Sequence, residues 1–370
     1  MKTVEQKNLE LGMQGALLDA LPHCGSEPVM IVGNDCVEPD LFTQVRNELH
    51  NCDGVITARQ VHTYFPGGYL VLQPNTYNLK GIQEKPGEGN EPSNFVNLVV
   101  HAHKNAAELL NILKQTQSAK DDAYERALTQ LFQQKHYQAL PYVGTWFPLK
   151  YPWHILSFSS HFLQKQELSL HPSSSVHPTA VIDGKVTLGR GVKIYPGASV
   201  CGPCTIGDRT IVGNNALVRG SSIGADCVIG YNSEVKDSVL YDHVWTHSTY
   251  IAESVVGHNV SFGAGCITAN LRLDEGEVYS QVKERKYNTH LQKFGTVIGE
   301  NVRIGIQVGL QPGVKIGSDT FINSRTLVTT DIPEKSFVCE KHGELTVKEN
   351  HFPCPQPELR EGFRGKILKK

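Results

Sequence analysis

The chain has 370 residues, and its 35 lysines and arginines against 37 aspartates and glutamates give a formal net charge of −2. This balance gives no electrostatic reason to expect nucleic acid or an anionic membrane as partner. A hydrophobic share of 39% favours a folded protein. The sequence contains no run of about 18 apolar residues, so no membrane-spanning helix is predicted. Residues 1–12 lack an apolar signal core, and nine cysteines without disulfide-scaffold spacing favour reduced thiols, so we expect a cytoplasmic protein.

The first part of the chain, residues 1–165, alternates expected helices with expected strands, which predicts an α/β layer fold. Helices are expected over 12–21, 41–50, 103–114, 121–134 and 153–164. Strands are expected over 28–35, 54–61, 68–73, 78–86 and 93–103. We expect His101 and His103 to form a solvated pair at a strand edge. Trp146, Tyr151 and Trp153 are expected to pack between the domains, and residues 166–175 form the linker.

The second part carries a repeat of six residues. From Val176 an aliphatic residue recurs every six positions, and the series is regular again from Ile298 to Val328. A helix cannot give this period, whereas six residues fit one short strand plus a corner, and three such sides close a coil of about 18 residues. The repeat predicts a left-handed parallel β-helix of hexapeptide repeats over 176–335, followed by a C-terminal tail, 336–370, packed irregularly on the prism or extending from it.

The repeat breaks at 236–255 and at 271–296, and the second, charged break predicts a loop, where function is often located. Arg219 and Lys236 lie about one coil apart, so their side chains should stack, and two stacked cations suit a phosphate. His247 lies nearby and is a natural general base. The alternative is that both cations are solvated corner residues and that His247 is a packed side chain.

Two weaker signals point to other chemistry. Cys201 and Cys204 have the spacing of a redox pair, although Cys204 falls in the inward column of the repeat, which favours packing. His243, His247 and His258 could hold zinc if the imidazoles met between subunits.

The motifs around the break resemble one enzyme family. The segment from Arg219 through GYNSEVKDS, HSTY and FGAGCITANLR is similar to the bifunctional sugar-1-phosphate nucleotidylyltransferase/glucosamine-1-phosphate N-acetyltransferases, above all those of archaeal type. The resemblance implies that Arg219 and Lys236 hold the sugar phosphate and that His247 deprotonates the 2-amino group. Tyr250 and Asn270 would position the sugar and the acetyl group. Acetyl-CoA would be the co-substrate, bound between subunits of a homotrimer.

The resemblance also has departures in this half. Gly276 stands where the family often has a loop lysine, which Lys283, Lys286 or Lys293 could replace. Thr330 stands where bacterial members have an arginine for coenzyme A. Acceptor specificity and affinity for acetyl-CoA therefore stay open.

The first half resembles the nucleotidylyltransferase part of the same family. The resemblance implies that Gly12, Glu84, Lys85 and Asn97 contact a nucleotide sugar and that Asp35 binds Mg²⁺. These roles could be vestigial, because Pro148 replaces the second metal-binding aspartate of the pattern and the glycine-rich phosphate loop, G-x-G-T-R, is absent. Phosphoryl-type transfer needs backbone amides, a basic residue and Mg²⁺ gathered on the triphosphate, so we expect nucleotidylyl transfer to be very weak.

Three functions follow from these observations. The leading hypothesis is an acetyl-CoA-dependent N-acetyltransferase that acts on an amino-sugar 1-phosphate and carries a truncated, degenerate nucleotidylyltransferase domain. The second is a sugar-1-phosphate nucleotidylyltransferase of the UDP-N-acetylglucosamine pyrophosphorylase type, of which this chain is a fragment. The third is an inactive regulatory or scaffolding subunit that binds a nucleotide sugar and pairs with a longer paralogue.

Overall fold

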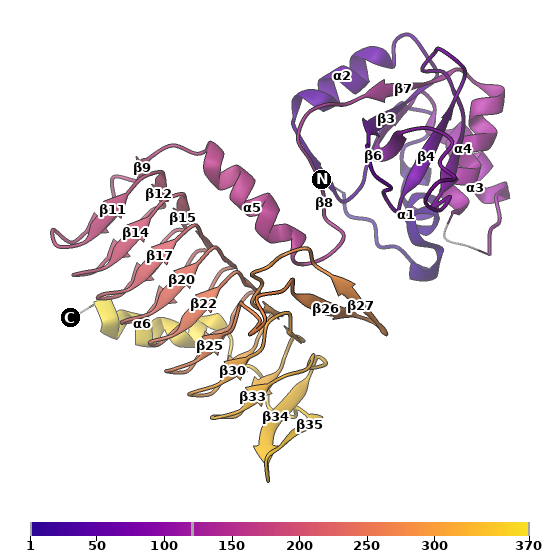
Figure 1. The fold of residues 1–370 in the computed structure, drawn as a ribbon. Coiled ribbons are helices and arrows are strands. Elements are labelled where there is room, and N and C mark those ends of the chain that lie inside the picture. The colour runs from indigo at the N-terminus through magenta and orange to yellow at the C-terminus, as the bar shows by residue number, and fades with distance from the viewer. Residues whose placement is uncertain (1, 120–121, 369–370) are drawn as a thin grey trace. The chain divides into compact units, whose positions relative to one another are not determined.

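The computed structural model describes residues 2–119 and 122–368, and the chain divides into two compact units, Met1–Lys150 and Tyr151–Lys370 (Figure 1). The expected boundary at residue 165 differs from this division, because helix α5 (His154–Lys165) belongs to the second unit. The segment after α5 is fixed to the β-helix by a hydrogen bond from Gln166 Nε2 to the carbonyl of Cys204, 2.9 Å long. No helix in the described part of the chain is long and apolar enough to cross a bilayer.

The first unit is a mostly antiparallel sheet with helices on both faces, which confirms the α/β expectation. Its strands run in the order β5-β4-β6-β3-β7, and β1 pairs with β6. Helices α1, α3 and α4 share one apolar core with the sheet, and α2 packs in a second core that contains Leu98 and Val100. The elements are η1 (Leu9–Leu11), α1 (Gly12–Ala20), η2 (Leu21–His23), β1 (Val29–Val32), β2 (Asp35–Val37), α2 (Asp40–Glu48), β3 (Gly54–Gln60), β4 (Gly68–Leu72), β5 (Leu79–Glu84), β6 (Phe95–His103), α3 (Ala106–Gln115), α4 (Ala123–Gln134), β7 (Tyr137–Pro141) and β8 (Trp146–Pro148).

The expectation of a solvated histidine pair was wrong. His101 and His103 lie inside β6, and both side chains are fully buried. Each is held by a tyrosine hydroxyl, because His101 Nδ1 lies 2.8 Å from the hydroxyl of Tyr124 and His103 Nδ1 lies 2.9 Å from that of Tyr137. Burial lowers the pKa of each imidazole to about 3, so both are neutral in the folded protein.

Each aromatic residue near the division has aromatic partners in its own unit. Trp146 packs on Phe65, with ring centres 5.1 Å apart, in the first unit. Tyr151 stacks on Trp153 at 4.5 Å, and Trp153 meets Phe294 at 6.1 Å in the second unit. Fully buried Phe294 and nearly buried Trp153 are the centre of a small separate core there.

The second unit is the expected parallel β-helix of hexapeptide repeats, with three faces of stacked short strands around one aliphatic core (Figure 1). The first face contains β9 (Ser169–Leu170), β12 (Val186–Leu188), β15 (Cys204–Ile206), β18 (Ser222–Ile223), β21 (Val239–Leu240), β23 (Val255–Val256), β28 (Val297–Ile298) and β31 (Lys315–Ile316). The second contains β10 (Ser175–Val176), β13 (Lys193–Ile194), β16 (Ile211–Val212), β19 (Val228–Ile229), β24 (Ser261–Phe262), β29 (Arg303–Ile304), β32 (Phe321–Ile322), β34 (Ser336–Lys341) and β35 (Glu344–Glu349). The third contains β11 (Val181–Asp183), β14 (Ser199–Cys201), β17 (Leu217–Arg219), β20 (Glu234–Lys236), β22 (Tyr250–Ala252), β25 (Ile267–Thr268), β30 (Gly309–Leu310) and β33 (Leu327–Val328).

The two breaks in the repeat have different structures. The first keeps the strand ladder, because Lys236 of β20 pairs with Ala252 of β22, and only the coil is shorter than its neighbours. The second break leaves the prism as a hairpin of β26 (Tyr279–Val282) and β27 (Arg285–Asn288). The strand pairing returns to the prism at β28, which pairs with β23.

The C-terminal segment is ordered against the second face rather than packed irregularly. After the β34–β35 hairpin it forms η3 (Pro357–Arg360) and α6 (Glu361–Leu368). Arg364, only 6% exposed, forms an ion pair with Asp226 and bonds to the carbonyl of Arg209. Arg360 lies over the ring of Trp245 at 5.6 Å. The segment therefore runs back over several coils.

Candidate functional site

Arg219 and Lys236 lie on the outer surface of the third face. They end β17 and β20 and are direct partners in the parallel register, and the preceding residues, Val218 and Val235, are fully buried in the core. Since side chains alternate across a strand, the two cations point outward, one above the other. The predicted stacking is therefore present in the structure.

Each cation has its own carboxylate partner. Arg219 donates to Glu234 Oε1 from Nε at 3.0 Å and from Nη2 at 2.6 Å, and this hydrogen bond raises the pKa of Arg219. Lys236 forms a close ion pair with Glu253 Oε1, and its ammonium lies 3.4 Å from Asp237. Burial lowers the pKa of Lys236, but the hydrogen bond and the charge of Glu253, together with Asp237, outweigh this effect and the pKa is raised.

Asn270 joins the same network. Its Nδ2 donates to Glu253 Oε2 at 2.5 Å, so the two oxygens of Glu253 hold Lys236 and Asn270 together. The side chains of Lys236 and Glu253 are only 12% and 11% exposed, whereas that of Arg219 is 44% exposed. Because exposed ion pairs contribute little, Arg219 is the cation that a phosphate could recruit at least cost.

Tyr250 and His247 lie on the side where the strands of the third face begin, whereas Arg219 and Lys236 lie where these strands end. Tyr250 begins β22 beside Glu234 and Ile267 in register. Burial, and then the charges of Glu253 and Glu234, raise the pKa of Tyr250. His247 is exposed at the corner before β22. Three strand residues separate this corner from the Glu253 corner, a span of about 10 Å.

The hairpin loop brings two of the three candidate lysines toward Asn270. The amide of Phe294 donates to the carbonyl of Asn270 at 2.9 Å, so the preceding residue, Lys293, returns to the base of the loop. Lys283 lies in the hairpin turn and Lys286 in β27. Lys293 therefore neighbours the predicted site, and Lys286 lines a pocket with Ala269 and Leu271, the residues on either side of Asn270.

The redox and zinc interpretations find no support. Cys204 is buried, its thiol donates to the carbonyl of Cys201 at 3.1 Å, and burial raises the pKa of Cys204 to about 11, the opposite of a reactive thiolate. His243 and His258 meet edge to face at 4.9 Å. Among the residues that the structure describes, no group of three or more histidine, cysteine or acidic side chains could hold a metal ion.

The first unit brings the nucleotide-sugar candidates close to one another, because Glu84 lines one pocket with Leu11 and Met13, which flank Gly12, and the side chains of Glu84 and Asn97 both lie beside Gly68. Gly12 begins α1, and Glu84 ends β5 with an ion pair of 3.2 Å to Lys85. Asn97 lies in β6, and its Oδ1 is 2.6 Å from His101 Nε2.

The Mg²⁺ position lacks its second carboxylate. Asp35 of β2 pairs directly with Pro148 of β8, so the position of the second metal-binding aspartate lies beside Asp35. The side chain of Asp35 lies outside what the structure describes, and a proline offers no side-chain oxygen. The residues present therefore do not provide the pair of carboxylates that the resemblance requires.

Known proteins with similar sequences belong to the family that the sequence motifs resemble. Residues 164–273 match the domain family described as "GMPPB C-terminal domain", and residues 295–330 match "Bacterial transferase hexapeptide (six repeats)". The Bifunctional protein GlmU of Methanococcus aeolicus is 30% identical, over 94% of this chain and 82% of the relative. The bifunctional sugar-1-phosphate nucleotidylyltransferase/acetyltransferase of Sulfurisphaera tokodaii is 31% identical, over 89% and 80%. A solved UDP-glucose pyrophosphorylase with bound UDP-glucose aligns with 44% of this chain and 65% of its own at 20% identity, and its TM-score of 0.39 is too low to establish a shared fold.

Proposed function

Because the chain belongs to the family of bifunctional sugar-1-phosphate nucleotidylyltransferase/acetyltransferases, we propose that its β-helix acetylates an amino-sugar 1-phosphate with acetyl-CoA in nucleotide-sugar synthesis. The observation that carries this proposal is the outer face of the β-helix, where Arg219, Lys236, Tyr250 and Asn270 lie on neighbouring coils. Cations for a phosphate and neutral donors for a sugar are the groups such an acceptor needs.

The proposed step is direct transfer without an acyl-enzyme. The amine nitrogen attacks the thioester carbonyl, the new C–N bond forms and the C–S bond breaks. His247 takes the proton that the nitrogen loses and passes it to the departing thiolate of coenzyme A. Arg219 binds the phosphate by exchanging Glu234, its partner at 2.6 Å, for the substrate. Tyr250 and Asn270 orient the sugar and the acetyl group.

The assembly and location are proposed with it. We propose that the protein acts in the cytoplasm as a homotrimer. The exposed apolar side chains that continue the third face beyond Tyr250 support the association, among them Ile267 (51% exposed) and Leu327 (49% exposed). Such a surface, when it is contiguous, favours association. Acetyl-CoA would bind at this interface.

For the first unit we propose a role other than nucleotidylyl transfer, in a subunit that can pair with a longer paralogue. The pairing of Asp35 with Pro148 favours this alternative, because the second carboxylate for Mg²⁺ is absent from that strand. Transfer from a nucleoside triphosphate to a sugar 1-phosphate in Mg²⁺ should be undetectable, and robust pyrophosphate release would contradict this assignment.

The catalytic assignment is tested with His247→Ala. Release of the coenzyme A thiol in the presence of glucosamine-1-phosphate should be lost by at least a hundredfold, since a general base contributes about 10²–10⁴. His351→Ala is the matched control, because His351 is another exposed histidine of the same unit, outside the site. Equal turnover of His247→Ala and the control would remove His247 from the mechanism.

A further inference from the structure

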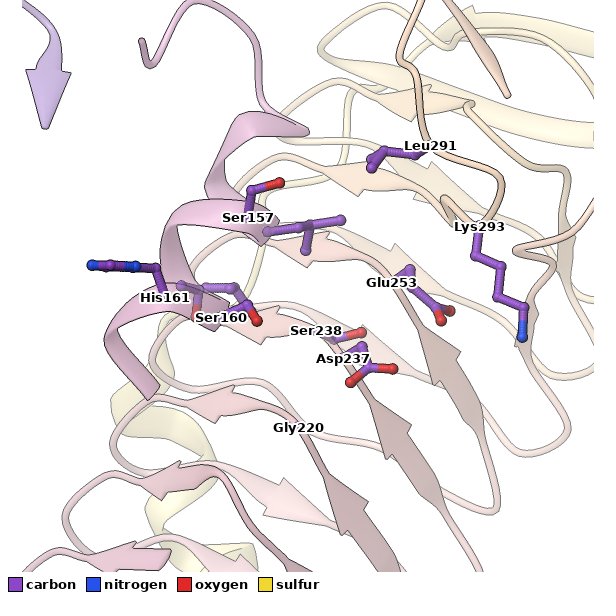
Figure 2. A pocket seen from close by; sticks show the side chains of 12 residues that line it. Ser157, Ser160, His161, Gly220, Asp237, Ser238, Glu253, Leu291 and Lys293 are labelled. Atoms are coloured by element: carbon purple, nitrogen blue, oxygen red, sulfur yellow. The ribbon is translucent and has the colours of Figure 1, made fainter. Parts of the chain in front are cut away.

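A pocket of about 460 Å³ lies within the second unit, between α5 and the corners of the β-helix (Figure 2). One wall is the face of α5 that carries Leu156, Ser157 and Ser160. The opposite wall includes Asp237 and Glu253, and Lys293 closes one side. The volume lies within the range of small-molecule sites. Nothing in the established family membership assigns a ligand to it.

Several donors of the pocket, Ser157, Ser160 and Lys293 among them, have no protein partner among the described residues. Ser157 and Ser160 are exposed on α5, and among the described residues their hydroxyls make no hydrogen bond. The ammonium of Lys293 likewise forms no ion pair within the part of the chain that the structure describes. In Figure 2 the two serines and Lys293 border the same space from opposite sides, while the ring of His161 points away from it. The pocket thus offers serine hydroxyls and a lysine cation to a ligand.

The far wall offers acceptors. The Asp237 side chain is 52% exposed, and its contact with Lys236 is a long 3.4 Å, so its carboxylate can accept further hydrogen bonds. Gly220 makes room for it, because a methyl group at this position would overlap the Asp237 carboxylate, and its φ of +60° also favours glycine. Glu253 completes this wall.

We propose that this pocket binds a monosaccharide that carries one anionic group. Sugar hydroxyls both donate and accept, so they can pair with the carboxylate of Asp237 and with the serines. Lys293, which has no ion pair among the described residues, takes the anionic group, which is a phosphate or a carboxylate. Val239, Leu156 and Leu291 provide the apolar surface for the ring carbons.

Glu253 connects this pocket to the acceptor site, and this connection rests on the proposed function. One carboxylate lines the pocket and holds Lys236 and Asn270 by its two oxygens. A ligand that binds to Glu253 or Lys293 changes how Lys236 and Asn270 are held. Coupling between two ligands is reciprocal, so a sugar in the pocket changes the apparent affinity for the acceptor.

The binding test is calorimetry on the full chain with glucose 1-phosphate, glucuronate and glucose as probes. Arg219→Ala is the background, since it weakens phosphate binding at the proposed acceptor site. Both anionic sugars should bind, and glucose should bind at least tenfold more weakly. Tighter binding of glucose 1-phosphate identifies a phosphate ligand, and tighter binding of glucuronate a sugar acid. Absence of binding by both anions, or equal binding of glucose, would overturn the proposal.

Variants assign the binding to the pocket. Ser160→Trp fills it and should abolish binding, and Lys293→Gln should weaken the anionic probes at least tenfold. Gln164→Trp is the control, because Gln164 is exposed one turn later on α5 and does not line the pocket. Undiminished binding by Ser160→Trp refutes the location.

The coupling is read separately, from the KM for glucosamine-1-phosphate with and without saturating glucuronate. A shift of this KM in the wild-type chain that is absent in Ser160→Trp supports the connection through Glu253. An unchanged KM in the wild-type chain refutes it. If no acetyl transfer occurs at all, the proposed function fails, whereas the calorimetry still decides on the pocket.

Discussion

Acidification should destabilise the first unit, because its two buried histidines must stay neutral in the folded protein. Their pKa is about 3 in the folded protein, whereas an exposed imidazole has a pKa of about 6.5. Between these values the unfolded chain binds more protons, so stability is complete above about pH 6.5 and falls as the pH decreases toward 3. The slope is about 1.4 kcal/mol per pH unit for each histidine, so both together remove about 4 kcal/mol between pH 7 and pH 5.

The assay is urea unfolding followed by circular dichroism at 222 nm, since four of the six described α-helices, α1 to α4, lie in the first unit. His103→Asn keeps a polar group for Tyr137 but does not titrate, so it should lower overall stability while removing about half of the pH dependence. His136→Asn is the control, because His136 is exposed in the same unit. If the wild type and His103→Asn lose stability in parallel between pH 7 and pH 5, the linkage argument is refuted.

Three further predictions concern the β-helix. Arg364→Met removes the buried ion pair to Asp226, should cost about 2 kcal/mol, and should make the C-terminal helix cleavable by protease under native conditions. Gly220→Ala places a side chain at φ +60° against Asp237 and should lower the free energy of unfolding by about 1–2 kcal/mol, which is measured as a lower urea midpoint. An unchanged midpoint would contradict the strain argument. Burial raises the pKa of Cys227 to about 12, so its thiol should resist Ellman's reagent at pH 8 until urea is added; modification of the folded protein would refute this.

The period of six was enough to predict the β-helix, because every coil directs aliphatic side chains into the same narrow core. Val218 and Val235 are fully buried, and the two cations one position later therefore face outward in register. A local pattern is enough for such predictions, since each coil contacts only its neighbours.

The partners of the cations could not be predicted in the same way. Glu253 bonds to Lys236 and Asn270 because the shortened coil brings the next corner under β20, and the separation of 17 residues hides each contact in the sequence. Glu234 had a visible signal, since it lies two residues before Lys236 and therefore on the same face of one strand.

The burial of His101 also depended on tertiary packing. A polar residue at the end of an apolar strand resembles an exposed edge, and its burial is acceptable because the Tyr124 hydroxyl from α4 and Asn97 Oδ1 satisfy its two ring nitrogens. The positions of Lys286 and Lys293 near Asn270 could not be predicted either, because they depend on the hairpin formed by pairing of β26 with β27.

The central claim is acetyl transfer to an acceptor that carries both an amine and a phosphate. The most direct test is thiol release from acetyl-CoA by the full chain, with glucosamine-1-phosphate, galactosamine-1-phosphate and the two non-phosphorylated amino sugars as acceptors. The account predicts turnover with at least one amino-sugar 1-phosphate and a large loss without the phosphate, with Arg219→Ala reducing the difference. A folded protein that turns over none of the four acceptors, or all four equally, would contradict it.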